Sequence, residues 1–182
     1  MRIFKLSIVL CLVLAAACCV CGCIQSDEPE TSASTAYVFD GTINWNLRGV
    51  WVDVDGKVLP KQESVDFSIS GTLPMEFEPY STVQMELNIV WPESLGYQNE
   101  GRQTYTGGAG VADKHNGQSI YHGSGWAYYT DLNDMHSLSF TICPDEGFVV
   151  VKLNGKYMVA SIKSDADPAA IMDFYKSYIS VH

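Results

Sequence analysis

Positive charge is scarce in this chain of 182 residues, which carries 11 Lys and Arg against 21 Asp and Glu and has a formal net charge of −10. A protein that binds nucleic acid needs a basic surface to meet the phosphates, so we expect no nucleic-acid partner. Collagen-like and heptad repeats are missing too, which excludes triple helices and long coiled coils. A hydrophobic content of 47% and an aromatic content of 12% exclude a wholly disordered chain.

Motifs of common enzymes are also absent. The sequence contains neither Gly-x-Ser-x-Gly nor His-Glu-x-x-His, and no Gly-Lys-Ser/Thr follows the glycine-rich run 107–110. His115 and His122 are seven residues apart, a spacing that fits neither a helical metal-binding pair nor a zinc finger. We therefore expect no cofactor and no metal, and a protein that is not an enzyme.

Long apolar runs are missing except at the N-terminus. There, Arg2 and Lys5 precede an apolar stretch from Leu6 to about Ala17, with Ser7 its only polar residue. A short positive segment followed by an apolar run of this length is typical of a signal peptide. An uncleaved membrane anchor is the alternative, because the run is close to the ~20 residues that span a bilayer.

The end of this segment decides between the two interpretations. Residues 20–23 read Val-Cys-Gly-Cys, which resembles the lipobox of bacterial lipoproteins: an aliphatic residue, a variable one, a small one and a cysteine. The resemblance covers only residues 1–23. It implies cleavage before Cys23, a lipid on the Cys23 thiol and a location at the bacterial cell membrane, facing outside the cytoplasm. Cys18, which follows three alanines, is a second candidate for lipidation.

These features predict three segments: a signal peptide over 1–22, the lipidated Cys23 with a polar tether over 23–35, and a single extracytoplasmic domain over 36–182. Four of the six cysteines would leave with the signal peptide and a fifth would carry lipid. Cys143 is then alone, so no disulfide forms within the domain. We expect Cys143 to be a half-buried, unreactive thiol, because the acidic residues after it raise a thiol pKa.

The body of the chain shows the period-two pattern of strands with one apolar and one polar face. Five segments carry it: 43–47, 50–54, 65–73, 83–89 and 138–142. Two dipeptides between apolar segments, Asp55-Gly56 and Asn154-Gly155, favour type I′ hairpin turns. We therefore expect a mostly β protein, an antiparallel β-sandwich or barrel. Between residues 94 and 125 the pattern fails, which indicates a long loop or a loosely paired hairpin.

One helix is expected, at the C-terminus. Asp167 is a favourable N-cap and Pro168 suits the first helical position. The apolar residues that follow recur at helical spacing, which predicts a helix over about 168–179 with one face packed on the sheet; they are Ile171, Phe174, Tyr175 and Tyr178.

Aromatic residues between 121 and 129 are the candidate ligand-binding groups. Rings flanked by small polar residues suit sugar stacking, and they also suit protein interfaces or core packing. Trp51 joins them, because it lies on the opposite strand face from Val50 and Val52 and is expected to be exposed. The speculative binding set is Trp51, Tyr121, His122, Trp126, Tyr128 and Tyr129.

The sequence thus predicts a membrane-anchored bacterial envelope lipoprotein with a non-catalytic binding or structural domain. An envelope protein is the favoured partner, and the lipid at the N-terminus holds the chain to the membrane. The alternative is a domain that binds a glycan or small ligand through the aromatics near 121–129. An envelope hydrolase comes third, since catalytic carboxylates can meet in space without any sequence motif.

The lipid anchor is tested by Cys23→Ala. The variant lacks the acceptor thiol, so we expect no lipid on the chain and a shift from the membrane to the soluble or unprocessed fraction. Cell fractionation with mass spectrometry of the N-terminal peptide measures both effects. Cys18→Ala is the matched control and keeps the lipid; a Cys23→Ala chain that still carries the lipid contradicts the prediction.

Overall fold

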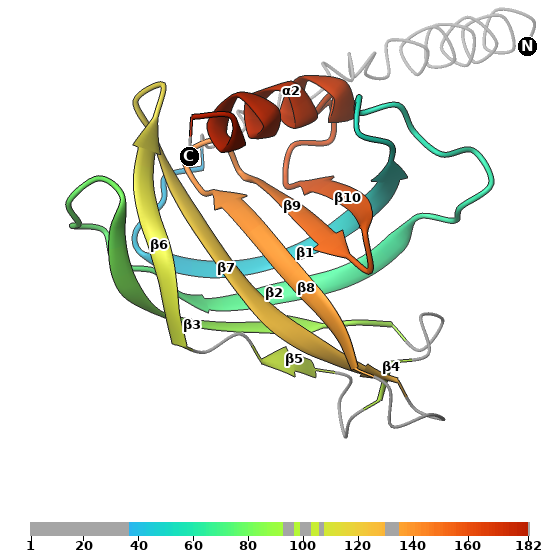
Figure 1. Cartoon of the computed structure of the whole chain (residues 1–182), viewed down its shortest axis with the longest axis horizontal. Helices are drawn as coiled ribbons and strands as arrows, with labels where there is room; N and C mark the ends of the chain where they lie inside the picture. The colour runs from blue at the N-terminus through green and yellow to red at the C-terminus, as the bar shows by residue number, and fades with distance from the viewer. Residues whose placement is uncertain (1–36, 93–96, 99–102, 106–107, 130–134, 182) are drawn as a thin grey trace, which may run out of the picture. The chain divides into compact units, whose positions relative to one another are not determined.

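The computed structural model describes residues 37–92, 97–98, 103–105, 108–129 and 135–181 (Figure 1). It describes the backbone alone at 97–98, 103–105, 108, 126–129 and 135–136. Tyr37–His182 form one compact unit. The expected signal peptide, the tether, Cys23 and its alternative Cys18 lie outside the described residues.

Ten strands and one helix make up the described part of the unit. The strands are β1 (Thr42–Val52), β2 (Val65–Thr72), β3 (Ser81–Val90), β4 (Tyr97–Gln98), β5 (Gln103–Tyr105), β6 (Gly108–His115), β7 (Gln118–Tyr129), β8 (Met135–Cys143), β9 (Phe148–Leu153) and β10 (Lys156–Ser161). The helix, α2, spans Pro168–Ile179. The expected fold class, mostly antiparallel β with one C-terminal helix, is confirmed.

Strand pairing closes the sheet on itself. Neighbours follow the order β2-β1-β10-β9-β8-β7-β6-β3, and β3 also pairs with β2, so eight antiparallel strands form a closed circuit. β1 and β3 each change partner along their length: β1 passes from β2 to β10, and β3 from β6 to β2. The fold is therefore a barrel with two corners. Each of these eight strands therefore pairs with two neighbours over part of its length, and none is left as an edge strand.

Large apolar side chains fill the inside of the barrel. Every second residue of β1 points inward and is buried, and the same alternation holds in β2 and β3. The interior cluster includes three tryptophans, Trp45, Trp51 and Trp91. Trp91 stacks on Phe67 with ring centroids 5.1 Å apart.

The expected exposure of Trp51 is wrong, although its assigned strand face is right. Trp51 lies opposite Val52, but its side is the barrel interior, where the ring is 8% exposed. Val52 is buried on the other side, beneath α2. Near its end β1 is thus covered on both faces, which the alternation of polar and apolar residues did not reveal.

The segment between 94 and 125 is also more regular than expected, because β6 and β7 form a tight hairpin within it. Its inward positions include Gly110 and Gly123, which carry no apolar signal. Side chains from neighbouring strands occupy that space: a Cβ at Gly110 would collide with Met85, and one at Gly123 with Phe140. The barrel is packed here by large residues lying over glycines.

Turn chemistry explains three loops. Asn154 and Gly155 both have positive φ (48° and 77°) and connect β9 to β10, as expected. Asn116 and Gly117 (51° and 83°) make the same turn between β6 and β7, which the sequence analysis did not predict.

At 55–56 the expected type I′ turn is wrong, since only Gly56 has positive φ (80°). A Cβ on Gly56 would lie 2.6 Å from the Cα of Ala169 in α2.

Helix α2 begins and ends where the sequence predicted. The Asp167 side chain accepts a hydrogen bond of 3.0 Å from the amide of Ala169, and Pro168 opens the helix. Helix α2 lies on the outside of the barrel, beside β9 and β10 (Figure 1). Its apolar face packs against residues of β1, β7, β8, β9 and β10. The second apolar cluster formed in this way includes Val52, Val150, Val159, Ile171, Met172, Tyr175 and Tyr178.

No helix in the described ranges is long and apolar enough to cross a membrane.

The contribution of α2 to stability is tested by Met172→Ala. The Met172 side chain is 1% exposed in the cluster beneath α2, so its truncation should lower the free energy of unfolding by about 2–5 kcal/mol. Chemical denaturation measures the change. Asp173→Ala, at the next and exposed position, is the control and should change stability by less than about 0.5 kcal/mol. Equal stability of both variants would show that α2 is a loose appendage.

Candidate functional site

In the part of the barrel that the structure describes, packed side chains occupy the space where some eight-stranded barrels hold a ligand. The inward side chains of the described strands form one contiguous buried cluster. Tyr121 illustrates this packing: its ring is 0% exposed, lies 5.4 Å from the ring of Phe77, and its hydroxyl donates to the carbonyl of Pro74. Burial raises the pKa of Tyr121 to about 12.

The expected aromatic binding set is therefore contradicted for two of its six members. Trp51 and Tyr121 are both buried in the barrel, because they lie on inward positions of their strands, and their rings present no surface to a ligand. Trp126, Tyr128 and Tyr129 belong to β7, but their side chains lie outside the description. Of the six candidate residues, His122 is the one whose side chain the structure describes on the outer face of the barrel.

His122 lines a hollow of about 190 Å³ on the outer face of β6 and β7. Tyr80, Val111, Tyr178 and Ile179 complete its lining. The Nδ1 atom of His122 is 2.9 Å from the Thr141 hydroxyl, and burial lowers the pKa of the imidazole. This ring is therefore held mainly neutral and fixed against β8.

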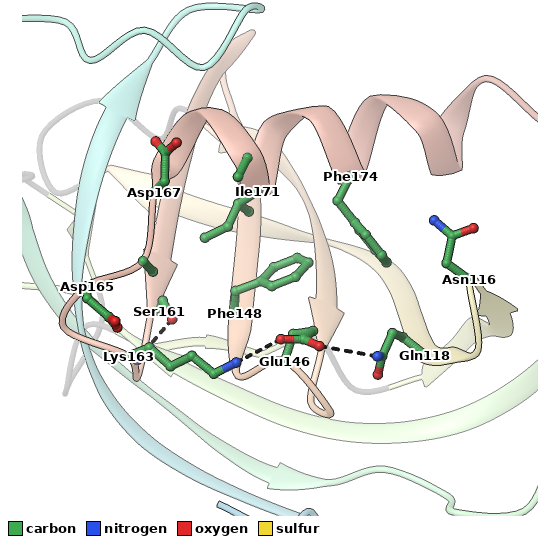
Figure 2. A pocket seen from close by; sticks show the side chains of 12 residues that line it. Asn116, Gln118, Glu146, Phe148, Ser161, Lys163, Asp165, Asp167, Ile171 and Phe174 are labelled. Atoms are coloured by element: carbon green, nitrogen blue, oxygen red, sulfur yellow. Dashed lines mark hydrogen bonds and ion pairs between the residues drawn. The ribbon is translucent and has the colours of Figure 1, made fainter. Parts of the chain in front are cut away.

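A larger hollow, about 470 Å³, lies between α2 and the loops beside it (Figure 2). We call it the α2 groove. Its lining residues are Asn116, Gln118, Glu146, Phe148, Ser161, Lys163, Asp165, Ala166, Asp167, Ala170, Ile171 and Phe174. A volume of this size falls within the range of small-ligand and peptide side-chain pockets.

The apolar side of the α2 groove comes from two elements. Ile171 and Phe174 project from α2, and Phe148 projects between them from the start of β9 (Figure 2). The rings of Phe148 and Phe174 meet edge to face, with centroids 5.5 Å apart and planes at 79°. Ala170 has a small side chain and is exposed, so it leaves the groove open above these rings.

The polar wall lies opposite the helix. The Lys163 ammonium is 2.7 Å from Glu146 Oε2, and the Gln118 amide nitrogen donates to Glu146 Oε1 at 3.2 Å. Ser161 braces the same wall from behind: its hydroxyl donates to the carbonyl of Gly147 at 3.0 Å and accepts from the amide of Lys163 at 3.0 Å. Three loops far apart in sequence are joined in this way.

The hairpin between β6 and β7 closes the far end of the α2 groove. His115 Nε2 is 2.7 Å from the Ser177 hydroxyl of α2, and its ring lies 5.1 Å from Phe174. The Ser177 hydroxyl donates to the carbonyl of Phe174, so it accepts from His115 when Nε2 carries the proton. These contacts fix Phe174, and with it the shape of the groove.

Sequence reasoning missed the α2 groove almost entirely. Its polar residues come from the β6–β7 hairpin, the turn before β9 and the segment before α2, and such residues meet only in the folded chain. Two signals pointed toward it: the run 148–151, apolar on both strand faces, and the apolar stripe of α2. Both indicate that a helix covers the strand at 148–151, but neither indicates which residues form the rim of the groove.

The described side chains form no cluster of three or more His, Cys, Asp or Glu that could hold a metal ion. Comparison of the chain with models of protein families, with curated protein sequences and with solved structures gives no match. We therefore infer function from the geometry of the barrel and its surface.

Cys143 is more deeply buried than expected, with 0% exposure, because its outward position on β8 lies in the cluster beneath α2. Burial, more than the neighbouring carboxylates, raises the pKa of its thiol to about 12. A free thiol of ordinary pKa reacts as its thiolate above about pH 8.

We therefore expect iodoacetamide at pH 8 to leave Cys143 unmodified in the folded chain and to modify it fully after denaturation. Mass spectrometry of the peptide that contains Cys143 measures both states. The thiolate fraction stays negligible up to about pH 10, so the folded chain should resist modification across that range. Rapid modification at pH 8 without unfolding would show that the cluster beneath α2 opens readily.

Proposed function

We propose that this chain is a bacterial envelope lipoprotein, held at the membrane through a lipid on Cys23, and that its barrel domain binds a protein partner in the α2 groove. The membrane part of the proposal rests on the signal-peptide pattern and on the resemblance of residues 20–23 to a lipobox. The binding part rests on one observation: an open apolar groove with a polar, internally braced rim.

The composition of the α2 groove favours a protein partner. Protein interfaces draw most of their affinity from apolar or aromatic anchors that fill pockets inside a polar rim. Phe148, Ile171 and Phe174 supply such a pocket, and Glu146, Lys163 and Gln118 supply the rim. Because this rim is already braced before any partner arrives, binding need not spend free energy on ordering it.

The geometry gives less support to a sugar. A pyranose stacks on a flat ring face, whereas the Phe148 and Phe174 rings stand nearly perpendicular to each other. A glycan or small ligand bound near 121–129 is still the second candidate. His122 faces a hollow there, and Trp126→Ala with a glycan array tests this candidate directly.

Hydrolysis by Ser161 or Glu146 in the α2 groove has little support. Ser161 is the hydroxyl among the lining residues, and it already donates its proton to the carbonyl of Gly147. The Glu146 carboxylate is held by Lys163 and Gln118. These two groups brace the wall of the groove, so neither is free to act on a substrate.

The proposed function is tested by a photo-crosslinking amino acid placed at Ala170 in the full chain, in intact cells. Ala170 is exposed and lines the α2 groove, so we expect a discrete adduct with a protein partner. The same group at Asn44, exposed on the far outer face of β1, is the matched control and should give no such adduct.

A second variant tests whether the adduct depends on the apolar side of the α2 groove. In a chain that carries the crosslinker at Ala170, Phe148→Ala removes a ring of the groove and should abolish the adduct. An adduct that survives Phe148→Ala, or that forms equally from position 44, contradicts binding in the α2 groove.

A further inference from the structure

The two ends of the α2 groove differ in charge. Asp165 and Asp167 lie at the end where α2 begins, and Asn116 and Gln118 lie at the opposite end (Figure 2). Between these ends stand the apolar side chains on one side and the Lys163–Glu146 pair on the other. The groove therefore has a distinct polarity along its length.

Negative charge at the acidic end is not balanced by a cation. Lys163, the basic residue of the lining, has its ammonium 2.7 Å from Glu146, so this pair is close to neutral. Within the described ranges no Lys, Arg or His forms an ion pair with Asp165 or Asp167. The start of α2 offsets part of the Asp167 charge through its helix dipole, and Asp165 has no such compensation.

The length of the α2 groove limits what it can hold. Seven residues separate Asp167 from Phe174 in α2, which at ~1.5 Å per residue is about 10 Å. An extended polypeptide advances about 3.3 Å per residue, so about three residues of a bound segment fit along this distance. At the neutral end, the side-chain amide of Asn116 is suited to a peptide backbone, because amides both donate and accept, and the Gln118 amide keeps its oxygen and its second N–H beside the bond to Glu146.

We infer that the α2 groove recognises a short extended polypeptide segment in which a Lys or Arg stands within two residues of an apolar side chain. The cationic group meets Asp165 and Asp167, and the apolar side chain enters between Phe148, Ile171 and Phe174. The net charge of −10 on the chain adds a long-range attraction for such a basic segment. This inference rests on the proposed function and narrows its partner by chemistry.

The same arrangement disfavours other ligands. A phosphate or an anionic headgroup would face uncompensated carboxylates at one end of the α2 groove. An uncharged apolar ligand would leave those carboxylates unused, and it would gain nothing from the charge of the chain. A basic and apolar segment is the partner that satisfies both the apolar side and the acidic end.

The test uses purified full chain in detergent and a displayed library of random 12-residue peptides. We expect enrichment of peptides with Lys or Arg within two residues of a Leu, Ile, Met, Phe or Trp. Ala170→Trp fills the α2 groove without altering a buried residue and should abolish the enrichment. Asn44→Trp adds the same ring on the outer face of β1 and should leave the enrichment unchanged.

Charge is then tested on the most enriched peptide. Asp165→Asn with Asp167→Asn removes both carboxylates, and Asn caps a helix as well as Asp does, so α2 keeps its N-cap. We expect affinity for the peptide to fall about three- to tenfold, the range for two exposed ion pairs. Glu63→Gln with Glu76→Gln removes two exposed charges outside the groove and should change the affinity less than about twofold.

The outcomes separate this inference from the proposed function. Peptides that depend on an open groove but lack basic residues, or that bind the Asp165/Asp167 double variant equally well, overturn the cationic segment and leave protein binding in place. A library that yields no peptide sensitive to Ala170→Trp overturns both. Enriched acidic peptides would likewise reject the inference.

Discussion

The structure depends on one constraint: several strands of this barrel are apolar on both faces, and both faces must leave water. Inside, Trp51, Val149 and Val151 join the barrel core; outside, Val52, Val150 and Val159 form a second apolar surface. Without a cover, that outer surface would be an exposed apolar patch. Helix α2 provides the cover. Because a helix is narrower than the sheet it lies on, its flank leaves a hollow, and the loops beside it turn this hollow into the α2 groove.

Much of the fold could be predicted from the sequence, for identifiable reasons. Alternation gave the strands around Ile43, Phe67 and Met85, and the cap at Asp167 gave the start of α2. The predictions were wrong where the alternation of apolar and polar residues did not show which face of a strand is buried. Trp51 was expected to be exposed because alternation along β1 does not distinguish a strand with one buried face from a strand that is buried on both faces. Between 94 and 125 a long loop and a loosely paired hairpin were both left open, and the regular β6–β7 pairing was not predicted, because Gly110 and Gly123 hold inward positions that Met85 and Phe140 fill from other strands.

The candidate site was less accessible to sequence reasoning than the fold. Aromatic residues near 121 attracted attention, but Tyr121 serves the core, packed against Phe39 and Phe77 at one end of the barrel. The rim of the α2 groove depends instead on contacts that join distant segments, as when Lys163 meets Glu146 and His115 meets Ser177. Such contacts leave no periodic or local signal. The sequence does show the net negative charge of the chain, but it does not show that Asp165 and Asp167 lie at one end of the groove.

We infer that α2 and the barrel form one cooperative unit, so that the α2 groove is part of the folded chain itself. Hydrogen exchange of the full chain, resolved by peptide, tests this most directly. Amides of one cooperative unit open together and share the same protection. We therefore expect amides in the middle of α2, around Met172 and Tyr175, to be protected to a similar degree as those of β9. Exchange in α2 that is faster than in β9 by orders of magnitude would show a helix that leaves the barrel independently, and a groove that is not a built site.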